Sequence, residues 1–453
     1  MKSLNRHLIA FTLGVSAILT SDINATSVSL GVSFQDDFAP VDKRPRLWMY
    51  KQDPSVSVFA KPEQVVSVVK VDSGPKNRLM EIKQNVVPKN KSGDFNSATY
   101  TPEEIDSVSS FATISRVHTM YRMDLERLKA REPKNIVLEA TVKMWDSGVT
   151  KPLMIYPHAG TDMNAFYNRD VQGNRSLNFF SFKESGTPNI VHTCQSADIV
   201  AHETGHAILD LLKPEYFSTN SAQTGAFHEA FGDLTAVLGL LDQPDMSERA
   251  FVESRGNLHT STFLNKVAEE FGTALGNSDG LRNADKDFVL SKVGDEVHDM
   301  SQVFTGAVYD VLAEGSLNHN LANGRMQPGP ILLYEAGRHV REVLLQSIVE
   351  SRQTAPTFAD IGQGMYSTFK KREQEHRQSI DGLNWSGYLI NQFLKHEIDV
   401  LSVSSSSSDA TKPMKAERRR ICGTMVNKMR PINDLGRSLE DALTSSEGDE
   451  SRD

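Results

Sequence analysis

ADIVAHETGHAILD, which spans residues 197–210, is the most informative stretch of the chain. His202 and His206 recur here at helical spacing with apolar residues, which predicts a buried helix with both imidazoles on one face. Two histidines four residues apart on a helix can bind the same zinc ion, and Glu203 between them can serve as base for the bound water. The alternative is an ordinary helix that carries these residues by chance. The pattern favours a zinc-binding helix.

GAFHEAFGD, residues 225–233, predicts a second and strongly apolar helix that ends near Gln243-Pro244. A catalytic zinc ion needs three protein ligands and one open position, and Glu229 is a good candidate for the third ligand. Asp233 lies one helical turn later, where its carboxylate could accept the second N–H of a ligand histidine and fix its tautomer. The alternative is a solvated acidic edge. The apolar surroundings favour the metal site, because an unpaired carboxylate is costly to bury.

Together the two stretches resemble the thermolysin-like zinc metallopeptidases, the glutamate-zincins. The resemblance implies that His202, His206 and Glu229 bind one catalytic Zn²⁺, with Glu203 as the base and Asp233 orienting a ligand histidine. It also implies an α+β, two-lobed zincin fold. In that fold an N-terminal α/β lobe with a mixed sheet and a mostly α-helical C-terminal lobe flank the zinc helix.

The match departs from the family at Gly205, where a better helix former is usual. Glycine inside a helix costs about 1 kcal/mol relative to alanine. A need for close packing at this position would explain the residue.

GDEVHDMSQ, residues 294–302, contains His298, which resembles the family's histidine that donates to the developing oxyanion. It precedes a predicted helix from Ser301 to about Ala313, closed by Gly315. The alternative is an ordinary core or surface histidine. Three acidic neighbours could orient the imidazole: Asp295, Glu296 and Asp299.

Tyr216 is a weaker match to a second oxyanion donor of the family. It lies ten residues after His206, but the loop to Glu229 is three residues longer than is usual in the family. The resemblance therefore implies a catalytic role for Tyr216 less strongly than for His298.

Asn164-Ala165-Phe166 is similar to the edge strand with which these enzymes hold an extended peptide. An exposed edge strand offers free N–H and C=O groups to which a peptide can add. Arg282 is similar to the family's arginine that binds a substrate carbonyl. The alternatives are a plain hairpin for the first segment and a surface charge for Arg282.

Local patterns predict strands over 136–145 and 152–156, and helices over 331–350, 358–372 and 385–396. A helix start near residue 102 and the composition divide the chain into a signal peptide (1–25), an N-terminal segment or small β-rich lobe (26–101), a catalytic α/β lobe (102–238), an α-helical lobe (239–400) and a disordered tail (401–453).

The formal net charge of −9 argues against a nucleic-acid partner. Lys2 and Arg6 precede a short apolar run, which predicts an export signal cut after Ala25. The protein would then be secreted or periplasmic without stable membrane insertion, or membrane-anchored if the signal is kept. The sequence predicts that its two cysteines, Cys194 and Cys422, form no structural disulfide. Calcium binding and the oligomeric state are left open.

The function that these features indicate is a zinc endopeptidase with a peptide or protein as substrate. One alternative is a zinc aminopeptidase, which would carry a G-x-M-E-N segment that this chain lacks. Another is a zincin fold kept as a catalytically idle binding or host-interaction protein. Loss of Glu203 or of a ligand would support that alternative, yet all four residues are present.

Overall fold

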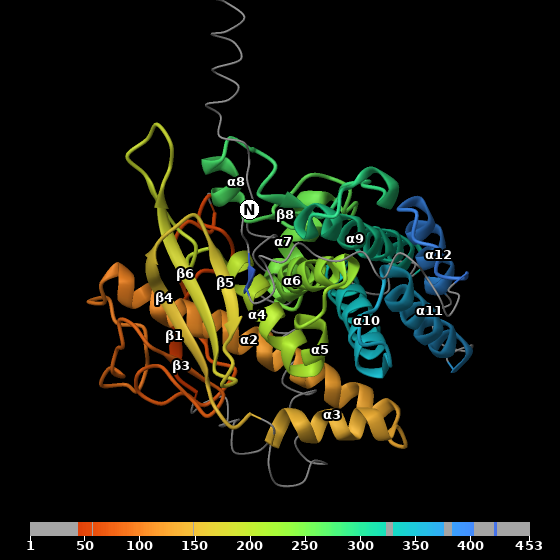
Figure 1. Cartoon of the computed structure of the whole chain (residues 1–453). Helices are drawn as coiled ribbons and strands as arrows, with labels where there is room; N and C mark the ends of the chain where they lie inside the picture. Colours follow the sequence, from red (N-terminus) through yellow and green to blue (C-terminus); the bar gives the residue numbers. More distant parts are fainter. Residues whose placement is uncertain are drawn as a thin grey trace, which may run out of the picture.

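A mixed sheet of six strands forms one side of the molecule, and most helices pack on the other side (Figure 1). The computed structural model describes residues 44–56, 58–147, 149–322, 329–375, 383–402 and 421–423. Its strands are β1 (Arg46–Met49), β2 (Glu63–Val66), β3 (Met80–Ile82), β4 (Leu153–Thr161), β5 (Ala165–Arg169), β6 (Arg175–Lys183), β7 (Ile190–His192), β8 (Lys266–Val267), β9 (Arg282–Asn283) and β10 (Ile421–Gly423).

The sheet has the order β10-β5-β6-β4-β3, and β7 also pairs with β6. The β3–β4 and β4–β6 pairs are parallel, and the other pairs in the sheet are antiparallel. The coarse prediction of a mixed sheet combined with helices is confirmed. Because β3 pairs with β4, residues before the predicted boundary at 102 complete the sheet of the residues after it.

The helices include two long ones, α2 and α6, that both pack on α4, the predicted zinc helix. Figure 1 labels all three. The bounds of the helices are α2 (Pro102–Arg131), α3 (Ile136–Ser147), α4 (Ala197–Leu212), α5 (Pro214–Phe217), α6 (Ala222–Leu241), α7 (Pro244–Ser254), α8 (Glu269–Ala274), α9 (Val297–Ala322), α10 (Gly329–Glu350), α11 (Phe358–Glu375) and α12 (Trp385–Lys395), with a 3₁₀ turn η2 (Leu290–Lys292). Thr101 and Glu104 cap α2 reciprocally, since each side chain accepts a hydrogen bond from the other's backbone N–H.

The strand predicted over 136–145 is wrong, because this segment forms the helix α3. Leu138, Val142 and Trp145 are its buried residues, and they recur every three or four positions. That period is helical, and it places all three side chains on the face that meets the core. The β-branched residues of this segment suggested a strand, but packing against α2 and α10 decides the conformation.

The helix that follows His298 is also longer than predicted. It begins at Val297 and continues through Gly315 to Ala322, so that His298 lies in its first turn. Gly315 does not end the helix. A Cβ atom there would overlap the ring of Trp385, so the glycine allows α12 to pack closely on α9.

α4 and α6 cross at a point where both helices carry glycine. An added Cβ on Gly205 would lie 2.7 Å from Thr235 Oγ1 and 3.1 Å from Gly232 Cα. An added Cβ on Gly232 would lie 2.6 Å from Nδ1 of His202. The glycine that departs from the family pattern is therefore required by the close approach of these two helices.

Two predicted segments lie outside the described residues, namely the signal peptide and most of the tail. The tail (401–453) is predicted to be disordered, but its residues 421–423 form the strand β10. Among the described residues, no helix is both long and apolar enough to cross a membrane. The remaining boundaries of the domain division stay predictions.

We expect Gly205→Ala to lower the midpoint of thermal unfolding. The gain in helix propensity is about 1 kcal/mol, whereas overpacking a filled contact typically costs about 1–3 kcal/mol. Gly239→Ala on α6 is the matched control, because its added methyl group meets nothing within 4 Å and should be neutral or stabilising. Equal midpoints for the two variants would contradict the proposed role of the crossing.

Candidate metal centre

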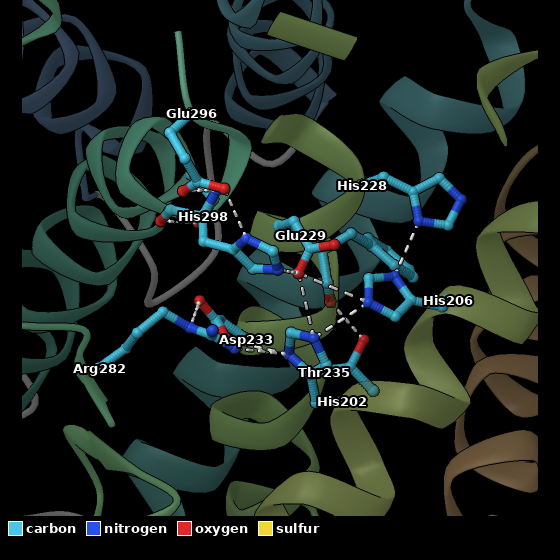
Figure 2. Close-up of polar contacts among 11 residues, drawn as sticks. His202, His206, His228, Glu229, Asp233, Thr235, Arg282, Glu296 and His298 are labelled. Atoms are coloured by element: carbon cyan, nitrogen blue, oxygen red, sulfur yellow. Dashed lines mark hydrogen bonds and ion pairs between the residues drawn. The ribbon is translucent and has the colours of Figure 1, made fainter. Parts of the chain in front are cut away.

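Three donor atoms from α4 and α6 converge in the buried interior (Figure 2). His202 Nε2 and His206 Nε2 lie 3.0 Å apart, and Glu229 Oε2 lies 3.4 Å from the first and 3.7 Å from the second. Zinc binds such atoms at about 2.0–2.1 Å, which places the corners of its tetrahedron roughly 3.3 Å apart. The separations match three corners of one tetrahedron, so these residues fit a zinc ion.

His202 is oriented from behind by Asp233. The Nδ1 atom of His202 lies 2.9 Å from Asp233 Oδ1, which holds a proton on Nδ1 and leaves the Nε2 lone pair directed at the other donors. Arg282 in turn donates to both oxygens of Asp233, from Nε at 2.9 and 3.0 Å and from Nη2 at 2.7 Å. This chain of contacts fixes the ring of the first predicted ligand.

His206 is oriented by His228, a residue for which the sequence suggested no role. The Nδ1 atoms of the two rings lie 2.8 Å apart, and the rings stack at 4.9 Å. Burial lowers the pKa of His228 to about 4, so its neutral imidazole can accept the Nδ1 proton of His206. The available signal was its position directly before Glu229 in GAFHEAFGD.

The charges of the cluster suit a bound cation. Burial opposes ionisation of Glu229, but His298, His206 and His202 outweigh it and hold the pKa of this carboxyl well below its usual value. Burial and the neighbouring imidazoles keep the pKa of His206 well below its usual value, although the charge of Glu229 opposes them. Despite burial, Asp233 and Glu229 raise the pKa of His202 to about 9. Two buried carboxylates thus favour a positive charge between them, which a proton or a metal ion can supply.

Glu203 lies beside the ligand atoms and is fully buried. One of its carboxylate oxygens lies within 4.8 Å of ring nitrogens of both His202 and His206. A single water molecule can bridge such a distance. The geometry therefore allows Glu203 to act on a water held at the centre.

His298 reaches the same cluster from α9. Its Nε2 lies 3.4 Å from Glu229 Oε2, and its Nδ1 lies 2.9 Å from Glu296 Oε1 (Figure 2). Of the three acidic neighbours left open by the sequence, Glu296 orients the imidazole. Glu296 also accepts the backbone N–H groups of His298 and Asp299, which ties the ring to the start of the helix.

Two residues have surroundings that differ from those expected. Tyr216 is buried on α5 with its ring 6.3 Å from that of Phe227. Among the described residues, the Tyr216 ring makes no ring contact with the predicted ligands His202 and His206. Burial, with Glu215 and Asp360 adding to it, raises its pKa to about 12. Arg282 is buried against Asp233, so the contacts of its guanidinium orient a ligand histidine.

The predicted substrate strand lies along α4. Asn164 and Ala165 are buried at the start of β5, which packs on α4. The edge of β5 is not entirely open, because β10 pairs with Phe166–Asn168. Sequence reasoning did not anticipate this partner.

Asp198, in the first turn of α4, has acidic neighbours. Its carboxyl is buried, and after burial the charges of Asp53 and Glu269 raise its pKa well above the usual value. Burial and Asp53 also raise the pKa of Glu269 and of Glu270 to about 7. A divalent cation would relieve this repulsion.

No family model and no curated protein matches this chain.

Proposed function

We propose that the chain is a zinc-dependent endopeptidase with a thermolysin-like, two-lobed zincin fold. The observation that carries the proposal is the tetrahedral spacing of His202 Nε2, His206 Nε2 and Glu229 Oε2 inside the protein. A zinc ion held by these atoms would polarise a carbonyl group and lower the pKa of a water molecule.

The surrounding side chains supply the remaining chemistry. Glu203 takes a proton from the attacking water and passes it to the leaving nitrogen of the scissile bond. His298 donates from Nε2 to the oxyanion that develops on the carbonyl oxygen. Despite burial, Glu229 and Glu296 raise the pKa of His298, which keeps a donor proton on the ring at neutral pH. Tyr216 is the weaker candidate for a second donor.

Substrate binding belongs to β5 in this proposal. Asn164 and Ala165 offer backbone groups to an extended peptide, which adds to the edge of the sheet beside α4. Arg282 contributes through Asp233, in addition to the substrate contact implied by the family resemblance. We also propose that the protein is exported. Its predicted signal peptide lies outside the described residues.

The alternative of an idle binding protein is less well supported. Such a protein has no need for a carboxylate beside two ligand histidines, yet Glu203 is fully buried in that position.

An aminopeptidase remains the enzymatic alternative. Acetylated peptides distinguish it, because an aminopeptidase requires a free amino terminus.

We expect Glu203→Gln to keep about one zinc per chain at this centre and to lose hydrolysis of casein, because only the base is removed. Glu229→Gln should instead lose the metal, since a ligand is removed. Chelation should abolish activity and added Zn²⁺ restore it. Glu375→Gln, at the exposed end of α11, is the control. Undiminished hydrolysis by Glu203→Gln would refute the mechanism.

We expect His298→Ala to lower kcat on the order of a hundredfold, with little change in KM, zinc content or unfolding midpoint. It should also flatten the alkaline limb of the pH–rate profile, because the raised pKa of His298 sets the pH at which the donor proton is lost. His259→Ala is the matched control, since that histidine also pairs with a carboxylate but is exposed. Loss of zinc or of folding would make His298 structural.

A further inference from the structure

A second group of metal-binding side chains lies outside the proposed catalytic centre. Asp106 on α2, His158 on β4 and His192 at the end of β7 bring their ligand atoms within 4.8 Å of one another. His158 Nε2 lies 3.3 Å from Asp106 Oδ2, and the two imidazole rings meet edge to face at 5.6 Å. Two imidazoles and one carboxylate from three separate elements make up a mixed nitrogen and oxygen donor set.

The fold holds this set in place. The pairing of β4 with β6 shifts register between Tyr156 and Gly160, and such bulges redirect the side chains they contain. His158 lies in this irregularity. The side chain of Gln84 donates to its carbonyl oxygen and accepts from its N–H, both at 2.9 Å. The direction of the His158 ring is therefore fixed by a local distortion of the sheet.

The group combines a buried carboxylate with ring nitrogens that lack hydrogen-bond partners. The carboxylate of Asp106 is 1% exposed and accepts hydrogen bonds from the Gln195 amide at 3.1 Å. Among the ion pairs of the described residues, the Asp106 carboxylate pairs with the imidazole of His158. Two buried ring nitrogens, His158 Nε2 and His192 Nδ1, have no hydrogen-bond partner among the described residues. Buried polar atoms of this kind are normally satisfied by a partner, water or an ion.

We propose that Asp106, His158 and His192 bind a second divalent metal ion, with Zn²⁺ as the foremost candidate. Mixed imidazole and carboxylate donors favour a first-row transition ion over Ca²⁺ or Mg²⁺, which prefer oxygen ligands. The two histidines are only partly buried, so solvent can complete the coordination. The ion would tie α2 to β4 and β7, three residues before Gln195 and just ahead of α4.

The test is the zinc content of the full chain after dialysis against metal-free buffer. With both centres present, wild type holds about two equivalents, whereas His192→Ala and Glu229→Gln each hold about one. Loss of one of three ligands should weaken the second site at least about a hundredfold, since even residues behind a ligand cost 10–100-fold. Glu375→Gln, at the exposed end of α11, is the control, and circular dichroism checks folding. Asp106→Asn serves as a near-isosteric second variant.

The outcomes separate the two proposals. If wild type holds one equivalent that is lost in His192→Ala and kept in Glu229→Gln, the second site stands and the catalytic site fails. If His192→Ala and Asp106→Asn both bind as much zinc as wild type, the second site is refuted, and the group is an ordinary imidazole–carboxylate pair.

A separate observation concerns β10, which covers the edge of β5 (Figure 1). The strands are antiparallel, with Ile421 opposite Asn168 and Gly423 opposite Phe166. Cα atoms of β10 also lie within 8 Å of Cα atoms in both α4 and α6. This tail strand therefore lies against the sheet edge and the two helices that carry the candidate metal ligands.

We infer that the tail strand competes with substrate for the edge of β5, an inference that rests on the proposed function. A peptide that binds at Asn164 and Ala165 and continues along the same edge of β5 needs the backbone groups of Phe166–Asn168, which β10 occupies. A segment tethered to the same chain competes at an effective concentration in the millimolar range. Release of the tail would then precede binding of an extended peptide.

The test replaces Cys422 and Gly423 together by proline in the full chain. Consecutive N–H groups of a strand point to opposite sides, so the pair removes the one that faces β5. KM for an extended peptide should fall about tenfold, and amide exchange at Phe166–Asn168 should quicken. Ser406→Pro, elsewhere in the tail, is the control. Unchanged KM and exchange would overturn the inference. Faster exchange with no hydrolysis by either protein would place the failure in the proposed function.

Discussion

The close crossing of α4 and α6 is the constraint on which the candidate centre depends. Two histidines on one helix and a glutamate on another can share a metal ion only if the helix axes approach closely. Gly205 and Gly232 remove the side chains that would separate them, and the ring of His202 fills the space above Gly232. The helix-propensity cost of glycine is offset by this contact. The same crossing brings Thr235 to the hydroxyl of Tyr121, which ties α6 to α2.

Behind the donor atoms, each histidine ring is held by a different kind of partner. His202 faces the carboxylate of Asp233, which is itself bound by Arg282. His206 faces a neutral imidazole, that of His228. An anionic partner strengthens the basicity of its ligand more than a neutral one does. The two predicted ligands are thus expected to differ in how strongly they hold a proton or a metal ion.

The two inferred features both concern the surroundings of α4, which carries two of the predicted ligands. A metal ion on Asp106, His158 and His192 would fix the sheet to α2 immediately before α4 begins. The tail strand lies where β5, α4 and α6 meet. One feature therefore concerns the rigidity of the scaffold and the other the access of a peptide to it. They are independent, because they involve different strands of the sheet.

The sequence by itself determined the parts that depend on local period and spacing. The four-residue spacing of His202 and His206 predicted α4, and the apolar period after Gly225 predicted α6. Where β-branched residues follow a helical period, as in residues 136–145, local propensity gave the wrong element, because burial of Trp145 decided the outcome.

Only the tertiary structure decided which residues meet across long separations. Glu296 pairs with His298 by local geometry, but His228 reaches His206 through the helix crossing. Asp106 reaches His158 and His192 through a sheet bulge, and β10 reaches β5 from far along the chain. These contacts depend on how elements pack and on strand register, which a one-dimensional pattern does not specify.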